Sequence, residues 1–347
     1  MAPVPNSAVA SQLVDAFGRT ARDLRVSLTD RCNLRCTYCM PAEGMQWLPG
    51  EEVLTDGEVV RLVRIAIETL GITKVRFTGG EPLLRKGLED IVAAVAGFTT
   101  VDGARPELTL TTNGLGLEHR ARALKDAGLD RVNISLDSLD PERYARLARR
   151  DRLHDVLAAI DASAAVGLTP VKVNAVIMRG QNEADIVPLA DYCLSRGHHL
   201  RYIEQMPLGP HDEWDRTQMV TQSEILAVLA GHYSLTPAST PRGAAPAELW
   251  DVAPDETQPG GRLGVIASVT GPFCGACDRT RITADGQMRN CLFARTETDL
   301  RGPMRAGADD AEIAQLWFGG QHAKRAGHGI GDPGFRQPDR NMSAIGG

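Results

Sequence analysis

The segment LRVSLTDRCNLRCTYC (residues 24–39) joins a β-type run directly to three closely spaced cysteines. Within the run, Arg25 and Ser27 alternate with apolar residues, which is the two-residue period of a strand. The cysteines follow the strand at once, and a barrel of parallel strands presents its active-site loops at that end. The segment therefore predicts a strand whose end carries a cysteine-rich functional loop.

Five further β-type runs alternate with helical patterns as far as about residue 207. The runs begin at Lys74 (KVRFTG), Glu107 (ELTLTTN), Arg131 (RVNISLD), Val171 (VKVNAVIM) and His199 (HLRYIEQ). The helical patterns begin near Thr55, Arg85, Glu118, Arg152 and Glu183. Strand–helix alternation indicates a parallel sheet with right-handed crossovers. Six such units fit an α/β fold of the incomplete (βα)6 TIM-like barrel type, and a doubly wound sheet also fits the pattern.

Five of these strands carry polar side chains along one face. The side chains are those of Arg25, Ser27, Thr29, Lys74, Arg76, Thr78, Thr109, Thr111, Asn113, Asn133, Ser135, Asp137, Lys172 and Asn174. A closed eight-stranded barrel fills its interior with Val, Ile and Leu, and burying polar groups unpaired costs about 1–3 kcal/mol each. We therefore expect a wide lumen lined by these side chains and filled with ligands and water. A sheet with one solvated face is the alternative.

The composition excludes several classes of protein. The net charge of −6 argues against a general nucleic-acid binder. No apolar stretch approaches the ~18 residues of a membrane helix, and the N-terminus lacks the pattern of a secretory signal. Six of the seven cysteines form two tight triplets, which is typical of metal binding in a reducing compartment. We predict a cytoplasmic protein that binds neither nucleic acid nor membrane.

Changes in composition divide the chain into four regions. We expect a flexible N-terminus at residues 1–20 and the partial barrel at residues 21–233. Residues 234–262 are rich in Pro, Ala and Gly and are expected to form a loop or insertion. Residues 263–347 form a C-terminal region that carries the second cysteine triplet and ends in a Gly-Gly tail.

The first triplet is Cys32, Cys36 and Cys39. Three thiolates hold a [4Fe–4S] cluster through three of its irons and leave the fourth iron open to another ligand. Structural zinc needs four protein ligands, and no histidine lies near this loop. The first triplet therefore predicts an iron–sulfur cluster with an open iron.

The spacing Cys-x3-Cys-x2-Cys, with the aromatic Tyr38 before the last cysteine, resembles the motif of the radical S-adenosylmethionine (SAM) superfamily. Further positions that match the superfamily are Gly79, Gly80, Glu81, Ser135 and Met206. The resemblance implies that the open iron binds the amino and carboxylate groups of SAM, that these residues contact SAM, and that Glu81 pairs with its ammonium. Reduction then releases a 5′-deoxyadenosyl radical that abstracts a hydrogen atom from the substrate.

The second triplet is Cys274, Cys277 and Cys291, again without a fourth cysteine nearby. We expect a second [4Fe–4S] cluster whose open iron binds substrate. A zinc site is the alternative, and His322 or His328 would have to complete it. The remaining Cys193 is expected to be a small buried residue.

Basic residues gather on the predicted barrel strands and between the cysteines of the second triplet. They are Arg25, Lys74, Arg76, Lys172, Arg201, Arg279 and Arg281. Cations grouped in an acidic chain predict a compact polyanion, because guanidinium groups bind phosphate oxygens in pairs. Aromatic residues make up only 5% of the chain, so a stacking platform for a nucleic-acid strand is not indicated. A nucleotide triphosphate fits better.

The pattern C-x2-C-x-R-x-R-I-T-x-D-G…C-L from Cys274 onwards resembles the GTP 3′,8-cyclase family, a radical SAM branch of molybdenum cofactor biosynthesis. The segment at residues 30–33 and the C-terminal Gly346 and Gly347 fit the same family. The resemblance implies a lyase that removes hydrogen from C3′ of GTP and joins C3′ to C8, with the guanine on the second cluster. Family positions that hold GTP match Arg25, Arg76, Thr111, Lys172, Arg279, Thr280 and Arg281, and the grouping of cations adds Lys74 and Arg201 as expected GTP contacts. Catalytic roles fall to Arg279, Arg281, Gly346 and Gly347.

The same resemblance implies partners. They are cyclic pyranopterin monophosphate synthase downstream, a reductant such as flavodoxin or ferredoxin, and a second copy of the chain, since the family tends to dimerise. Two other functions stay open. A radical SAM maturase acting on peptides generally needs more auxiliary cysteines than the four outside the first triplet. A non-catalytic zinc or iron–sulfur module has no need of a Gly-Gly-Glu-Pro segment or of five strands with polar faces.

Overall fold

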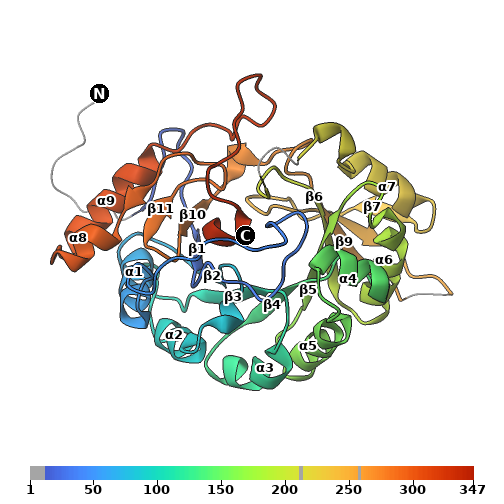
Figure 1. The fold of residues 1–347 in the computed structure, drawn as a ribbon, viewed down its shortest axis with the longest axis horizontal. Coiled ribbons are helices and arrows are strands. Elements are labelled where there is room, and N and C mark those ends of the chain that lie inside the picture. Colours follow the sequence, from blue (N-terminus) through green and yellow to red (C-terminus); the bar gives the residue numbers. More distant parts are fainter. Residues whose placement is uncertain (1–11, 211–213, 257–258) are drawn as a thin grey trace.

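The computed structural model describes residues 12–210, 214–256 and 259–347, and most of its strands curve into an open barrel (Figure 1). The strands are β1 (Asp23–Ser27), β2 (Lys74–Thr78), β3 (Glu107–Thr112), β4 (Arg131–Ser135), β5 (Lys172–Ile177), β6 (His199–Glu204), β7 (Leu235–Pro237), β8 (Glu248–Val252), β9 (Gly261–Ile266), β10 (Arg279–Ile282), β11 (Gln287–Arg289) and β12 (Thr298–Asp299). They form one sheet in the order β12-β11-β10-β1-β2-β3-β4-β5-β6-β9-β8-β7.

The strands β1 to β6 follow one another in sequence order and pair in parallel. A doubly wound sheet reverses its strand order at a switch point, and no reversal occurs between β1 and β6. The predicted incomplete (βα)6 barrel is therefore confirmed, and the doubly wound alternative is wrong.

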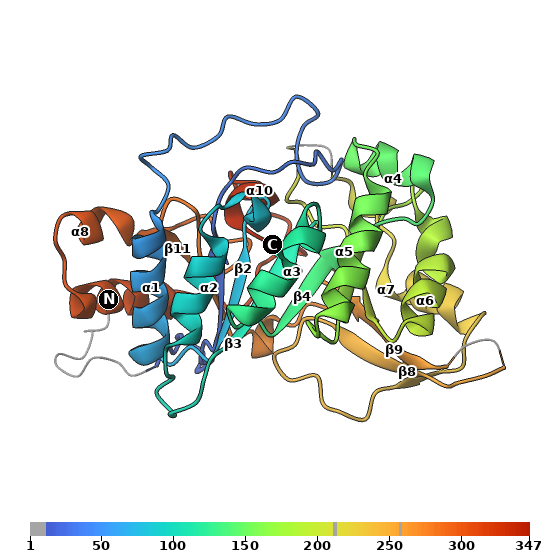
Figure 2. The same cartoon turned by 90° about the horizontal axis from the view of Figure 1, so that it is seen from below.

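Helices cover the outer face of this sheet (Figures 1 and 2). The helices are α1 (Asp56–Glu68), α2 (Leu88–Ala96), α3 (Leu117–Asp126), α4 (Pro141–Ala148), α5 (Leu153–Ala165), α6 (Ile186–Ser195), α7 (Gln222–Ala230), α8 (Arg301–Arg305), α9 (Asp310–His322) and α10 (Met342–Ile345). The helix α1 begins at a capping box, in which Thr55 and Glu58 each accept a hydrogen bond from the other's backbone N–H. The short α10 lies inside the barrel beside the C-terminus.

The two faces of the barrel strands differ as the alternating pattern predicts. Outward residues such as Val26, Phe77 and Ile134 have no exposed surface and belong to the hydrophobic core beneath the helices. Cys193 is equally buried, as expected. Inward residues lie side by side across the sheet, because β1 and β2 pair in register with Arg25 opposite Arg76. This register concentrates the polar side chains in the lumen.

The C-terminal region extends both edges of the barrel. The strand β10 pairs in parallel with β1, and β9 pairs in parallel with β6. The second cysteine triplet is thereby carried next to the strand that precedes the first triplet. The predicted C-terminal extension is therefore part of the barrel wall.

The structure adds detail to two regional expectations. In the loop or insertion expected at residues 234–262, β7, β8 and the start of β9 pair as an antiparallel ribbon. Residues 1–11 of the expected flexible N-terminus lie outside the described residues, but residues 12–20 are packed. Leu13 is fully buried and its N–H donates to the carbonyl of Leu70. No helix among the described residues is long and apolar enough to cross a membrane.

Candidate active site in the barrel lumen

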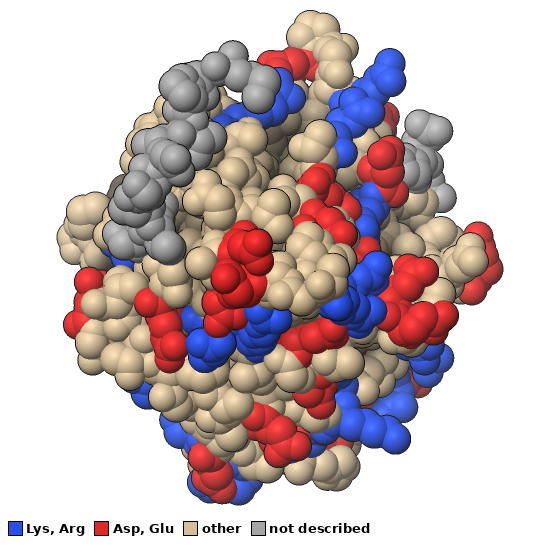
Figure 3. Space-filling view, turned by 90° about the vertical axis from the view of Figure 1, so that its left-hand side faces the viewer, with Lys and Arg blue, Asp and Glu red and all other residues tan. Residues whose placement is uncertain are grey.

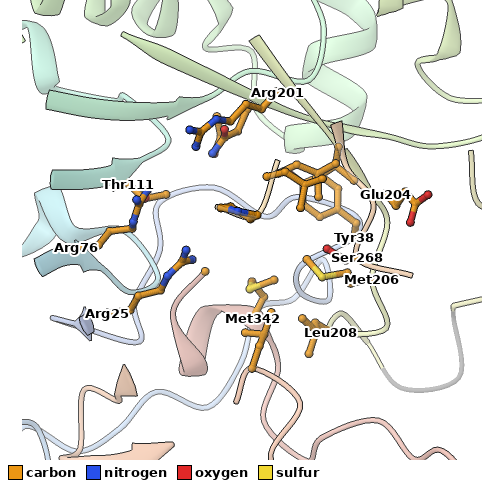
Figure 4. Close-up of a pocket in the computed structure, with 18 of the residues that line it drawn as sticks. Arg25, Tyr38, Arg76, Thr111, Arg201, Glu204, Met206, Leu208, Ser268 and Met342 are labelled. Carbon is orange, nitrogen blue, oxygen red and sulfur yellow. The ribbon is translucent and has the colours of Figure 1, made fainter. Parts of the chain in front are cut away.

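The lumen contains a cavity of about 220 Å³ whose wall is built from the inner faces of the barrel strands (Figure 4). Its strand residues include Arg25, Arg76, Thr111, Ser135, Asn174, Val176, Arg201 and Ile203. The polar lumen predicted from the alternating pattern is therefore confirmed, and a sheet with one solvated face is excluded.

The first cysteine triplet lies beyond the C-terminal end of β1. Cys32, Cys36 and Cys39 line a cavity of about 140 Å³. Tyr38 and Ser135 line both this cavity and the central one. The first triplet therefore opens towards the lumen.

The surroundings of the first triplet oppose free thiolates. Burial raises the pKa of Cys36 well above its usual range and that of Cys39 to about 12, and the carboxylate of Asp137 adds to both shifts. Asp137 accepts hydrogen bonds from the Tyr38 hydroxyl (2.8 Å) and the Val176 N–H (2.9 Å), and burial raises its pKa to about 6. Thiolates at this position therefore depend on the positive charge of a bound metal cluster.

At the two positions directly after β2, the backbone of the loop after β1 leaves room for glycine only. Gly79 has a φ of +143°, and a Cβ atom on it would collide with the carbonyl oxygen of Thr29. A Cβ atom on Gly80 would collide with the carbonyl oxygen of Arg31. The pair therefore lets the loop after β2 pack against the loop after β1, and both glycines line the cavity of the first triplet.

Glu81 does not reach that cavity. Its fully buried carboxylate accepts hydrogen bonds from Leu83 N–H (2.9 Å), Thr112 Oγ1 (2.7 Å) and Asn113 N–H (2.7 Å). Burial nevertheless raises its pKa to about 7. The structure corrects the prediction that Glu81 pairs with the SAM ammonium, because its oxygens fasten the loop after β2 to the end of β3.

The second cysteine triplet lies on another side of the same lumen. Cys274, Cys277 and Cys291 line a cavity of about 70 Å³ together with Met206 and Arg279. Met206 and Arg279 also line the central cavity. Both triplets therefore face one shared space, from different elements.

A buried lysine stands against the second triplet. The ammonium of Lys324, which is 4% exposed, donates to Sγ (3.3 Å) and the carbonyl oxygen (3.3 Å) of Cys277 and to the carbonyl oxygen of Arg279 (2.9 Å). Burial would raise the pKa of Cys277, but Lys324 and Arg279 outweigh it and lower the pKa. Sequence reasoning missed Lys324, because it follows its partner by 47 residues and belongs to no local motif.

The histidines needed for a zinc site at the second triplet are engaged elsewhere. His328 Nε2 donates to the Ser268 carbonyl (3.1 Å), and its Nδ1 accepts from the Ile330 N–H (3.1 Å). His322 is exposed and its ring faces the Val14 carbonyl (3.4 Å). Both ring nitrogens of His328 are therefore engaged, and the exposed ring of His322 lies against Val14, which favours the cluster over zinc.

Several guanidinium groups in the lumen keep one nitrogen atom without a protein partner in the described part of the chain. The Nε atoms of Arg25, Arg76 and Arg279 are buried, and none has a hydrogen-bond partner among the described residues. Burial lowers the pKa of Arg25 to about 9 and those of Arg76 and Arg201 to about 10, so all three remain charged at neutral pH. Arg25, Arg76 and Arg201 are seen around the central cavity in Figure 4. The lumen therefore carries an excess of positive charge.

The C-terminal glycines lie inside the barrel. Arg281 Nη1 donates to the Gly346 carbonyl (2.6 Å), and Thr78 Oγ1 donates to the Gly347 carbonyl (2.9 Å). Gly346 has a φ of +86°, and a Cβ atom on it would lie 3.0 Å from Thr78 Cγ2. Gly347 lines both the central cavity and that of the first triplet. The chain end is thus brought between the two cysteine triplets.

Three predicted GTP contacts do not line the central cavity, and two of them, Lys74 and Thr280, face away from it. The Lys74 side chain is 55% exposed at the start of β2 and pairs with Glu107 at 3.9 Å. Thr280 is fully buried on the outer face of β10, where its Oγ1 accepts a hydrogen bond from Trp317 Nε1 (3.0 Å). The structure corrects both predictions, because strand alternation turns Thr280 away from its neighbours Arg279 and Arg281.

Lys172 occupies an intermediate position at the start of β5. It does not line the central cavity. Burial and the nearby charges of Arg201, Arg131 and Arg76 lower its pKa to about 7. Lys172 therefore interacts with the arginines of the lumen but lies at the edge of that group.

Sequence reasoning also missed two residues at the first triplet. Asp137 appeared only as one polar position among many, although it follows Ser135 on the same strand face. Asn113 Nδ2 donates to Asn33 Oδ1 (2.7 Å) and lies 3.8 Å from Cys32 Sγ. Both residues follow the C-terminal end of a barrel strand, which is the signal that could have found them.

Comparison with known proteins identifies the family. A GTP 3′,8-cyclase of Corynebacterium glutamicum is 65% identical over 337 residues, covering 96% of this chain and 89% of the relative. This chain belongs to the GTP 3′,8-cyclase family. A GTP 3′,8-cyclase of Mycolicibacterium smegmatis is 60% identical over 335 residues, covering 96% of the chain and 92% of the relative. Residues 26–193 match the radical SAM superfamily, and residues 198–330 match the Molybdenum Cofactor Synthesis C family.

A solved structure confirms the fold class. SuiB of Streptococcus suis, bound to SAM, aligns with a TM-score of 0.57 at 14% identity, covering 89% of this chain and 68% of SuiB. At this identity the likeness concerns the fold alone. As a member of the GTP 3′,8-cyclase family, the chain is a radical SAM enzyme of molybdenum cofactor biosynthesis that uses an iron–sulfur cluster and SAM.

The donor groups fit such a cluster. The cysteines of both triplets are free, and each triplet lines one cavity. Among the described residues, no three His, Cys, Asp or Glu side chains form a group suited to a metal ion. A four-iron cluster is wider than one ion, and its thiolate ligands bind different irons. Three separated thiols around a cavity therefore suit the cluster better than a lone ion.

Proposed function

We propose that this member of the GTP 3′,8-cyclase family converts GTP into 3′,8-cyclo-7,8-dihydro-GTP. The observation that carries the proposal is the cavity between two cysteine triplets, where Arg25 and Arg76 hold buried Nε groups without a protein partner. The buried carboxylate of Asp23 interacts with these arginines, but one negative charge cannot balance all of them, and a buried charge without a partner costs about 3–5 kcal/mol. A ligand with several negative charges removes that cost, and a triphosphate offers oxygens that guanidinium groups bind in pairs.

The substrate orientation follows from the two ends of the cavity. We assign the triphosphate to the part of the central cavity that is lined by Arg25, Arg76, Arg201 and Thr111. Lys172 adds positive charge at the edge of this part. The guanine then lies towards the second triplet, which we assign to a second [4Fe–4S] cluster with an open iron. In support, the thiol of Cys277 already has a lowered pKa and an ammonium beside it.

SAM binding is assigned to the cavity of the first triplet. Tyr38, Gly79, Gly80 and Ser135 line that cavity, and Met206 lies further along the lumen. Glu81 shapes the loop that carries the glycines and is not assigned a direct contact. A reduced cluster with SAM supplies a 5′-deoxyadenosyl radical, which removes the hydrogen atom from C3′ of the ribose.

The residues of the chain then guide ring closure. Bond formation between C3′ and C8 leaves an unpaired electron on the purine, so one electron and one proton complete the product. Arg279 and Arg281 flank the space in front of the second triplet, and their fixed positive charges stabilise negative charge on the guanine during this step. Gly346 and Gly347, held by Arg281 and Thr78, fill the lumen between the triplets and exclude water from the radical.

The wider setting is part of the same proposal. The product passes to cyclic pyranopterin monophosphate synthase, and a flavodoxin or ferredoxin supplies electrons to a homodimeric enzyme. We assign the enzyme to the cytoplasm, where the free state of all seven cysteines is maintained.

Anaerobic turnover tests the proposal. The reconstituted protein is incubated with SAM, a strong reductant and either GTP or ATP, and mass spectrometry coupled to chromatography follows 5′-deoxyadenosine and the nucleotide. We expect GTP-dependent 5′-deoxyadenosine and a nucleotide product that has the mass of GTP but separates from it. SAM cleavage with unchanged GTP would reject the substrate while leaving radical SAM chemistry intact.

A further inference from the structure

A second unpaired group of arginines lies outside the lumen. Arg295, Arg325 and Arg336 are exposed and line a surface cavity of about 470 Å³. None of these three guanidinium groups has a hydrogen bond or ion pair with any residue that the structure describes. Asp332 contributes a carboxylate to the same lining. The cavity therefore presents net positive charge on a chain whose overall charge is −6.

Surface arginines on another face are paired. Arg61 and Arg64 both reach Asp310, at 2.8 Å and 2.6 Å, and Arg305 reaches Glu58 at 2.7 Å. Figure 3 shows basic and acidic side chains intermingled on the side of the molecule where α8 and α9 lie. The arginines around the cavity therefore differ from these paired ones in that three guanidinium groups, unpaired among the described residues, line a single cavity.

The surface cavity shares a wall with the second triplet. Asn290, Cys291, Phe293 and His328 line both this cavity and the smaller one formed by the triplet cysteines. The ring of Phe335 meets Phe293 edge to face at a centroid distance of 5.9 Å. The cavity thus has an aromatic floor against the second triplet and arginines around it.

One buried arginine makes this wall rigid. The Arg19 guanidinium donates to the carbonyl oxygens of Cys274 (2.6 Å), Arg325 (2.6 Å) and Ala326 (2.9 Å). The loop of the second triplet is thereby tied to the segment that carries Arg325. A surface fixed in this way is ready to bind without an ordering cost.

We propose that the surface cavity formed by Cys291, Phe335, Arg295, Arg325 and Arg336, the Cys291 face, docks an acidic one-electron carrier protein. An apolar centre with arginines around it is the usual anatomy of a protein interface, and opposite charge speeds and orients the encounter. The inference rests on the proposed second cluster. One electron passes from the carrier, which is oxidised, to that cluster, which is reduced, and no covalent bond forms or breaks.

The test uses the reconstituted full-length enzyme and flavodoxin hydroquinone as the probe. The variant R295Q/R325Q/R336Q is compared with R122Q/R146Q/R150Q, which removes three exposed arginines elsewhere and changes the net charge equally. We expect the first variant to bind flavodoxin about tenfold more weakly at low salt and to be reduced about tenfold more slowly, since steering contributes at least that factor. The control variant stays near wild type.

Dithionite and iron analysis separate the possible outcomes. Dithionite should reduce both variants at the wild-type rate, because a small reductant needs no docking face. Unchanged flavodoxin binding and reduction in R295Q/R325Q/R336Q, or an equal loss in the control, would overturn the proposal. The proposal would also be overturned if inorganic phosphate displaced flavodoxin while R295Q/R325Q/R336Q accepted electrons at the wild-type rate. Wild-type protein with only one cluster would instead reject the proposed function.

Discussion

The two cysteine triplets offer the same number of thiols to one lumen, but a buried carboxylate stands beside the first triplet and a buried ammonium beside the second. Cys36 and Cys39 lie near the buried carboxylate of Asp137, and their pKa values are raised. In the second triplet, Cys277 lies against Lys324 and Arg279 and its pKa is lowered, whereas burial raises the pKa of Cys274. Nearby cations stabilise the more negative, reduced form of a cluster, and nearby anions oppose it.

This difference suggests a division of labour within one enzyme. Under the proposed function, a cluster at the first triplet is the stronger reductant, as cleavage of SAM requires. The proposed second cluster would then accept an electron more readily and face an anionic substrate. On this proposal the difference comes from charges next to the thiols and not from a different number of ligands.

The largest expected effects come from removing one thiol of each triplet. Cys39→Ser should lower 5′-deoxyadenosine formation to background, because the cluster that receives SAM is lost. With dithionite as the reductant, Cys277→Ser should keep SAM cleavage, now without dependence on GTP, and lose the cyclised nucleotide. Both products are measured by mass spectrometry, with Cys193→Ala, a substitution far from either triplet, as the control for folding. Equal loss of SAM cleavage in both serine variants would remove the division of labour.

Arg281→Gln should lower the rate of cyclisation about 100-fold, the usual effect of removing a charge that stabilises a transition state. It should also release the Gly346 carbonyl, which accepts from Arg281 at 2.6 Å. Iron content and ultraviolet–visible spectra should stay those of wild type. Arg146→Gln serves as the matched control on the outer surface. A loss of either cluster would mean that Arg281 supports the metal site instead of the reaction.

Lys324→Met sharpens the comparison at the second triplet. The lost ammonium no longer stabilises the reduced cluster, so its reduction potential should fall and cyclisation should slow by about tenfold, as for other partners of metal ligands. Redox titration followed by electron paramagnetic resonance measures the potential, and Lys324→Arg should restore most of it. The first cluster should keep its potential. A shift in both clusters would show that the substitution perturbs the whole fold.

The smallest effect concerns pH and Lys172. Its pKa is lowered to about 7, so in the free enzyme the side chain loses its proton as the pH rises past 7. Binding of a polyanion favours the charged form, so the affinity for GTP should fall above pH 7. Loss of this one charge is worth about 1 kcal/mol, or about fivefold in affinity. Equilibrium binding across pH 6–9 checks the slope, and Lys172→Arg, which stays charged, should show none of it.

The sequence predicts the barrel well because strand alternation is a local property. The polar positions at every second residue of β1 to β5 indicate the lumen, and Arg25, Arg76, Thr111 and Ser135 all line it. The cysteine spacings and the Gly-Gly segment likewise mark both ends of the site, because each motif consists of residues that are close together in the chain.

The contacts of other residues could not be predicted, because the direction of their side chains depends on partners that are distant in the sequence. Thr280 lies between two lumen arginines in the sequence but faces Trp317 of α9. Glu81 is held by three donors from the loop after β2 and from the end of β3, and no motif announces that arrangement. Lys324 contacts Cys277 although α9 separates the two residues in the sequence.

The most direct test of the account is electron paramagnetic resonance of the reduced enzyme with GTP or SAM added separately. Wild type is compared with the variant Cys32→Ser/Cys36→Ser/Cys39→Ser, which retains only the second triplet. The account predicts that GTP changes the spectrum of the second cluster in both proteins, whereas SAM changes only the signal that the triple variant lacks. A second-triplet signal that GTP leaves unchanged would contradict the assignment of substrate and cofactor to opposite ends of the lumen.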